Sequence, residues 1–245
     1  MPLVASDLIA YSAADRPSDD VSAAGGAIDA TVRPILTPLT AVDDLEAVSS
    51  SASDTGVLSV VGRLETGEIA TLNLPLAGTT KVEDSTLFER VLSVQYSTTP
   101  VGTLTLRRRP TGAIVCVIPS GERGVSALFK GAAARNVGSV RYDKFFFKNV
   151  HGSLTLSSAT IRLTGDPSVR IRIGLATALN DSGEVANRMT APAGISFVDD
   201  NVDISVPGGG TLAPSQAIGV WVEQTLIAAA SAVNSTLSVS LNGTS

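Results

Sequence analysis

Apolar and polar residues alternate in short runs along most of the chain, which is the pattern of β-strands that bury one face. Residues 68–76, for example, place Leu72 and Leu74 on the same face. In the first half of the chain, runs of this kind occupy residues 56–65, 68–76, 87–97, 102–109 and 113–119. Because glycines separate the runs at short spacing, they predict a small antiparallel sandwich over residues 56–130.

The strand pattern restarts near residue 140. The stretch RYDKFFFKNV contains Phe145, Phe146 and Phe147 in a row, which predicts a strand buried on both faces. Further strand patterns lie at residues 152–165, 168–177, 195–198, 202–206, 217–225 and 235–243. Together they predict a second sandwich over residues 138–245. The stretch LIAAASAVN at 226–234 fits either a short helix or a loop that crosses between sheets.

The first 55 residues do not share this regular pattern. Pro17, Pro34 and Pro38 exclude a long helix, and the short apolar patches between them suit an extended arm that packs on a neighbouring molecule. The glycine-rich residues 121–139 predict a linker. The expected fold is all-β, with two tandem antiparallel β-sandwiches preceded by an extended N-terminal arm. The expected domains are 1–55 for the arm, 56–130 for the first sandwich and 138–245 for the second.

Composition supports a folded, sheet-rich chain. Apolar residues make up 44% of the 245 positions and charged residues 17%, enough to form a large core. The net charge of −5 argues against binding to a phosphate backbone, which needs clustered cations. The basic run Arg107, Arg108 and Arg109 would alternate between faces of a strand. We therefore expect no sequence-specific nucleic-acid binding. No apolar run is long enough to span a membrane, and the N-terminus lacks the pattern of a signal peptide.

The scarcity of reactive side chains bears on catalysis. His151 is the only histidine and Cys116 the only cysteine, so one chain cannot form a zinc site of the usual Cys/His type. A Ser-His-Asp triad would have to use His151, which lies in an expected turn, NVHGS. Cys116 lies in AIVCVIP, which is apolar on both faces and predicts a central strand with a buried thiol. These features predict that the protein is not an enzyme.

Two loops deserve comparison with known binding patterns. Asp199, Asp200 and Asp203 could pair as carboxylates in a glycosidase or bind calcium, but their spacing matches no complete calcium loop. The PGGGT stretch at 207–211 lacks the lysine of a phosphate-binding loop. Both are interpreted as turns between strands. The Asn-x-Ser/Thr motifs at Asn234 and Asn242 are interpreted as chance matches. No catalytic, cofactor-binding or metal-binding residue is therefore assigned, and no cofactor is expected.

Trp221 is the only tryptophan. It lies on the strand face opposite Ile218, Val220 and Val222. If those three residues face the core, Trp221 is either exposed, where it would suit a protein interface or a sugar platform, or buried beneath the N-terminal arm.

Several long stretches together resemble structural proteins of the tailed-bacteriophage virion that carry tandem β-sandwich, immunoglobulin-like modules. The resemblance rests on LVASDLIAYSAADRPSDDVSAAGGAID, VVGRLETGEIATLNLPLAGTTKVEDSTLFERVLSVQYS, FFFKNVHGSLTLSSATIRL and GTLAPSQAIGVWVEQTLIAAASAVNSTLSVSLNG. It covers most of the chain and implies a structural component of a phage particle. It carries over no catalytic residue.

Three functions follow as hypotheses. The first is a subunit of the tail or head–tail neck that packs symmetrically, with itself and other virion proteins, around the DNA path. The second is a decoration protein that clamps the major capsid protein on the outside of the head. The third is a carbohydrate-binding or adhesion module that would use Trp221 for glycan contact. The first two predict a protein made in the host cytoplasm and located in the virion.

Overall fold

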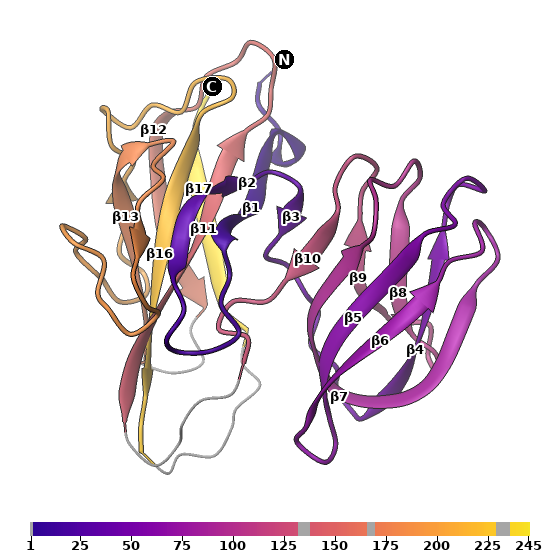
Figure 1. The fold of residues 1–245 in the computed structure, drawn as a ribbon. Coiled ribbons are helices and arrows are strands. Elements are labelled where there is room, and N and C mark those ends of the chain that lie inside the picture. Colours follow the sequence, from indigo (N-terminus) through magenta and orange to yellow (C-terminus); the bar gives the residue numbers. More distant parts are fainter. Residues whose placement is uncertain (1, 132–137, 166–169, 229–235) are drawn as a thin grey trace. The chain divides into compact units, whose positions relative to one another are not determined.

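The computed structural model describes residues 2–131, 138–165, 170–228 and 236–245, and within these residues the chain is built from β-strands. No α-helix occurs in the described residues, and a single 3-10 turn, η1 at Ala5–Asp7, precedes the first strand (Figure 1). The sheets are curled and antiparallel except for one short parallel contact. The expected all-β, sandwich-like fold is therefore confirmed.

The chain divides into two compact units, and the first of them is discontinuous in sequence. It combines Met1–Asp29 with Leu128–Ser245, and we call it the discontinuous unit. The second comprises Ala30–Ala127, and we call it the inserted unit. The expected domain boundaries differ from these, because part of the predicted arm belongs to each unit.

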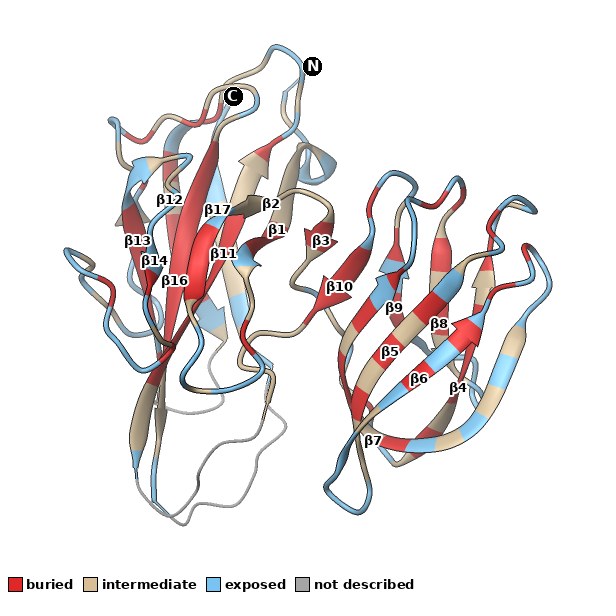
Figure 2. Cartoon of the chain, viewed as in Figure 1, coloured by how far each residue is buried: buried red, intermediate tan, exposed pale blue. Residues whose placement is uncertain are grey.

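The discontinuous unit contains two sheets. The larger has the strand order β13-β16-β11-β1-β2-β14, and the smaller has the order β15-β12-β17. Their strands are β1 Leu8–Asp15, β2 Ala24–Asp29, β11 Ser139–Asn149, β12 Ser157–Gly165, β13 Ile171–Leu179, β14 Glu184–Val185, β15 Ile204–Ser205, β16 Ala217–Leu226 and β17 Ser238–Thr244. β11 lies at the centre of the larger sheet, between β1 and β16. The burial pattern along it is shown in Figure 2.

The three consecutive phenylalanines of β11 pack on both faces of the sheet, as the sequence predicts. Phe145 belongs to the main core of the unit, together with residues of β12, β13 and β16. Phe147 packs against the same core. Phe146 points to the opposite face and joins Ala13 and Ala217 in a separate buried cluster. A strand can bury successive residues in this way only when both of its faces are covered.

The extended N-terminal arm is not present. Within it, β1 pairs antiparallel with β11, and β2 pairs with β1 and β14, so residues 8–29 complete the larger sheet of the discontinuous unit. The prediction failed because these strands are rich in alanine and glycine, which weakens their apolar periodicity. β1 nevertheless forms backbone hydrogen bonds with β11, which is far away in sequence. Strand formation here therefore depends on this long-range pairing.

The inserted unit is one curled sheet of eight strands. They are β3 Val32–Arg33, β4 Asp43–Ser49, β5 Val57–Leu64, β6 Ile69–Pro75, β7 Val82–Tyr96, β8 Leu104–Arg108, β9 Ile114–Ile118 and β10 Gly124–Ser126. The long strand β7 joins two layers. Its first half pairs with β4, which continues to β8 and β9, and its second half lies between β5 and β10. A strand shared in this way lets one sheet fold over its own core.

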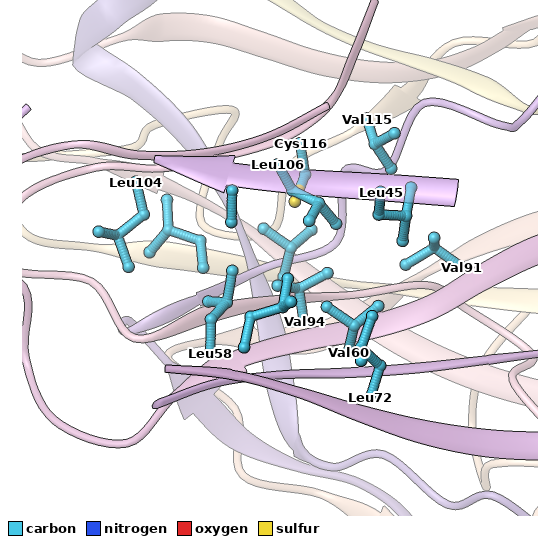
Figure 3. Packing of buried hydrophobic residues seen from close by; sticks show 14 of the residues in the cluster. Leu45, Leu58, Val60, Leu72, Val91, Val94, Leu104, Leu106, Val115 and Cys116 are labelled. Carbon is cyan, nitrogen blue, oxygen red and sulfur yellow. The ribbon is translucent and has the colours of Figure 1, made fainter. Parts of the chain in front are cut away.

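The core of the inserted unit is aliphatic. The inward-facing residues of β4 to β9 form one buried cluster, and Figure 3 shows Leu45, Leu58, Leu106 and Val94 converging in it. Leu72 and Leu74 of β6 belong to this cluster, as their spacing predicts. Alternation of buried and exposed positions along β6 is visible in Figure 2.

Two expectations about connecting and central segments need correction. β9 is not a central strand: it pairs only with β8 among the described strands and exposes Ile114 and Val117. The predicted linker at 121–139 contains β10, which pairs with β7, and the start of β11. Its residues 132–137 lie outside the described residues, as does most of the predicted helix or crossing loop at 226–234.

A buried carboxylate connects two loops of the inserted unit. Asp54 is 2% exposed. It accepts hydrogen bonds from the Ser49 hydroxyl at 2.6 Å, the Val101 N–H at 2.8 Å and the Gly102 N–H at 2.9 Å. Burial raises the pKa of Asp54, but these three donors favour its charged form and hold the pKa below its usual value.

Asp54→Asn is expected to destabilise the inserted unit by about 1–3 kcal/mol. Both carboxylate oxygens of Asp54 accept hydrogen bonds, and in the variant the amide NH₂ replaces one of them and faces another hydrogen-bond donor. The folded pKa is depressed, so the carboxylate stabilises the fold above its unfolded pKa of about 3.9 and loses this effect as pH falls through the folded value. The difference between wild type and variant should therefore shrink in acid. Urea unfolding followed by circular dichroism over a pH series measures it. Asp44→Asn, at a surface ion pair with Arg109, is the control and should cost less than about 1 kcal/mol.

Candidate functional site

Several deeply buried charged residues of the discontinuous unit lie at or near the start of β11. Arg188 is 1% exposed. Its guanidinium donates to the Lys130 carbonyl at 2.8 Å and to the Pro17 carbonyl at 2.5 Å. Its Nε lies 3.4 Å from Oδ1 of Asp143, which is 5% exposed. Burial raises the pKa of Asp143, whereas Arg188 and the Phe129 N–H, which donates to it, act in the opposite direction.

A second buried arginine extends this cluster to the N-terminal part of the chain. Arg141 is 2% exposed and pairs with Asp20, which lies in the connection between β1 and β2. Asp20 also lies 4.0 Å from Arg188. The cluster therefore fastens residues 17–20 and Lys130 onto β11. Its charges face one another, which is an arrangement suited to holding segments together.

Lys144 forms a separate buried cation site on the next position of β11. Its side chain is 0% exposed, and Nζ donates to the Gly26 carbonyl at 3.1 Å, the Gly183 carbonyl at 3.0 Å and Oδ2 of Asp181 at 2.5 Å. Nζ also lies 4.8 Å from the ring centroid of Phe146 and 5.3 Å from that of Trp221. Burial lowers the pKa of Lys144, and the Asp181 carboxylate opposes this shift. Three oxygen acceptors and two aromatic faces suit an ammonium that clips β2 and the loop before β14 to the sheet.

Trp221 is buried, not exposed. It is 2% exposed and packs with Ala24, Tyr142 and Val185. A Cβ at Gly25 of β2 would lie 2.5 Å from the indole ring, so only glycine allows β2 to lie this close. Of the two alternatives that the sequence left open, burial beneath the N-terminal segment is the one observed. Trp221 therefore presents no platform for a sugar.

His151 occupies the turn between β11 and β12, as expected, and is half-buried. Its Nδ1 accepts hydrogen bonds from the Ser153 N–H at 3.1 Å and the Leu154 N–H at 2.9 Å. This nitrogen therefore orders the turn and is not available as a base.

Cys116 is a buried apolar side chain, as predicted. It is 4% exposed in the core of the inserted unit. Burial raises the pKa of its thiol to about 12. The thiolate that a nucleophile or a metal ligand requires is therefore strongly disfavoured.

The acidic and glycine-rich loops behave as turns. Asp203 forms a bidentate pair with Arg162, at 2.8 and 2.6 Å, and Asp200 accepts from Asn201 at 2.7 Å. Asp199 lies beside them in the same turn. Among the residues that the structure describes, no group of three or more His, Cys, Asp or Glu side chains is placed to hold a metal ion.

In the PGGGT loop, Gly208, Gly209 and Gly210 all have positive φ, which makes a tight turn between β15 and β16. Asn242 lies on β17 and donates to the Ser240 hydroxyl at 3.3 Å, whereas Asn234 is outside the described residues.

Two arginines of the basic run, Arg108 at the end of β8 and Arg109 directly after it, form ion pairs with carboxylates. Arg108 pairs with Asp43, and Arg109 lies 2.8 Å from Asp44 and 3.0 Å from Glu83. Arg107 lies opposite Glu46 on the neighbouring strand β4. This pairing, in addition to the alternation of faces, removes the run as a phosphate-binding patch.

Exposed apolar side chains are the feature of the surface that the sequence pattern did not reveal. Among the described strands, those that expose large apolar side chains belong to the inserted unit, where Ile69 of β6 is 50% exposed, Leu87 of β7 50%, and Ile114 and Val117 of β9 51% and 38%. β6 and β9 are edge strands of the curled sheet. Apolar alternation predicts a buried face, but only the strand order reveals that the other face and one edge lie open.

Comparison with protein-family models, curated proteins and solved structures yields no match for this chain. Among the described residues, no helix is both long and apolar enough to cross a membrane. The candidate functional features are thus the edge of β6 and the exposed apolar side chains of the inserted unit, together with the buried ionic clusters that hold the discontinuous unit in shape.

Proposed function

We propose that the protein is a non-enzymatic structural subunit of a tailed-phage virion that packs symmetrically in the tail or the head–tail neck. The observation that carries the proposal is the set of apolar side chains that strands of the inserted unit expose away from the β6 edge, namely Leu87, Ile114 and Val117. Exposed apolar side chains favour aggregation of an isolated monomer, and they stabilise an assembly when another subunit covers them.

Two further observations support this proposal. The quoted resemblance to phage virion proteins covers strands of both units. The net charge of −5 suits a surface that DNA passes without binding, because like charges repel. In this proposal the protein is made in the host cytoplasm, resides in the virion and has copies of itself and other virion proteins as partners.

Capsid decoration is the less favoured candidate, because it predicts an N-terminal arm that becomes ordered only on the capsid lattice. Residues 8–29 are instead strands of the discontinuous unit. The adhesion hypothesis loses its candidate residue, because Trp221 is 2% exposed.

Light scattering coupled to size exclusion, followed by electron microscopy of the purified protein, tests the proposal. A closed ring of at least six copies is expected for a tail or neck subunit. A trimer would favour decoration instead. A protein that stays monomeric at its highest soluble concentration would count against both.

A further inference from the structure

The outer edge of β6 lacks a partner among the described residues. β6 pairs only with β5, in the register that places Leu58 opposite Leu74 and Val60 opposite Leu72. β9, another edge, is already contacted, since the Thr37 N–H donates to the Val115 carbonyl at 2.8 Å. β13 likewise bridges to Val198 on its side of the sheet.

The direction of the β6 backbone groups follows from two hydrogen bonds at its ends. The Leu64 N–H donates to the Glu68 carbonyl, and the Leu76 N–H donates to the Gly56 carbonyl, both at 2.9 Å. In an antiparallel ladder the bonded pairs recur at every second residue, so Leu72 and its even-numbered neighbours face β5. The N–H and C=O groups of Ile69, Thr71 and Asn73 therefore point outward from the edge.

This edge also lacks the usual features that prevent strands from pairing. Natural edge strands are blunted by lysines, inward charges, bulges or prolines. β6 carries no charged residue from Ile69 to Asn73, and its proline, Pro75, is at the very end. Its pairing with β5 has no bulge. Its outward side chains Ile69, Thr71 and Asn73 are exposed.

The edge of β6 can pair with its own copy in a register centred on Thr71. With a two-fold axis at this residue, two antiparallel β6 strands place Thr71 opposite Thr71 and Ile69 opposite Asn73, and all three residues exchange hydrogen bonds. The flanking carboxylate Glu68 then lies opposite Leu74, so no two like charges face each other along the strand.

We propose that β6 is a docking edge for a second copy of this chain, joined by two-fold antiparallel pairing centred on Thr71. The contact extends the sheet of one inserted unit into that of its partner. It does not depend on the proposed virion role, because a two-fold contact neither needs nor forms a closed ring. If rings do form through another surface, this edge joins them in pairs.

The first test removes the central donor. Thr71→Pro takes away an N–H that points outward and leaves the bonds to β5 in place, as edge strands tolerate. Light scattering should give a particle of half the wild-type mass, with an unchanged circular dichroism spectrum. A wild-type chain that scatters as a monomer of 25.0 kDa would overturn the proposal. So would a folded Thr71→Pro variant that keeps the wild-type mass.

A second test checks the register and does not depend on the proline variant folding. Thr71→Lys and Thr71→Glu each put like charges opposite each other at the two-fold axis, so each alone should have half the wild-type mass. An equimolar mixture should recover the full mass, because lysine then faces glutamate. Gln95→Lys is the control, since it adds the same charge on β7, two strands from the edge, and should keep the wild-type mass. A mixture that fails to reassociate would contradict pairing centred on Thr71.

Discussion

Arg188→Met is expected to destabilise the discontinuous unit by about 3–5 kcal/mol, since it leaves the buried Asp143 carboxylate without its cation. Arg188 is 1% exposed, and its partners Asp143 and the carbonyls of Pro17 and Lys130 are supplied by three separate stretches of chain. The loss should loosen these stretches together. Urea unfolding followed by the fluorescence of Trp221, which belongs to the same unit, measures the change.

The matched control is Arg162→Met, which makes the same substitution at an exposed ion pair with Asp203. It should cost less than about 1 kcal/mol, because water can solvate the remaining carboxylate. Equal effects of the two substitutions would contradict the structural role assigned to the buried cluster.

The pH dependence of the Arg188→Met variant gives a second readout. Removing the cation raises the pKa of Asp143 beyond the increase that burial already causes. The carboxyl group then takes up a proton more readily in the folded state than in the unfolded state, so the variant gains stability relative to wild type as pH falls. The penalty should be largest at neutral pH. A penalty that grows in acid would contradict this assignment.

Trp221→Ala is expected to destabilise the same unit by about 3–5 kcal/mol, the usual cost of deleting a large buried aromatic side chain. The indole packs closely against Gly25 of β2 and covers Lys144, whose Nζ is 5.3 Å from the ring centroid. Its removal leaves a cavity and a less shielded ammonium. Thermal unfolding by calorimetry measures the loss.

Trp221→Phe is the control, because a smaller ring still covers part of the cavity and keeps a π-face for Lys144. It should cost clearly less than Trp221→Ala, and it should partly relieve the steric conflict of Gly25→Ala, whose Cβ would lie 2.5 Å from the indole. If Trp221→Ala left stability unchanged and abolished binding to a glycan array, the adhesion hypothesis would return.

Local patterns determined most of the inserted unit. Alternation along β6 correctly placed Leu72 and Leu74 in its core. The prediction succeeds because each strand of a curled antiparallel sheet has one buried face, so apolar residues recur at every second position. The pattern failed for β9, because exposed Ile114 and Val117 look the same in sequence as buried ones.

The candidate site was far less accessible to sequence reasoning. Arg188 and Asp143 are 45 residues apart, and the residues next to each of them in sequence do not indicate that it is buried. Lys144 sits between aromatic rings that only the register of β11 with β16 brings together. Glycine at position 25 has a physical reason only once Trp221 lies against it.

The sequence by itself thus determined the all-β class, the strand positions with strong alternation and the buried state of Cys116, since these depend on local periodicity and composition. Three features were decided by the tertiary structure alone. Residues 8–29 join a sheet whose other strands lie more than a hundred residues later in the chain, and Trp221 lies against β2. The strand order also decides which strands are edges. The physical reason is that strand pairing and side-chain burial are set by partners distant in sequence, and local patterns carry no record of which partners those are.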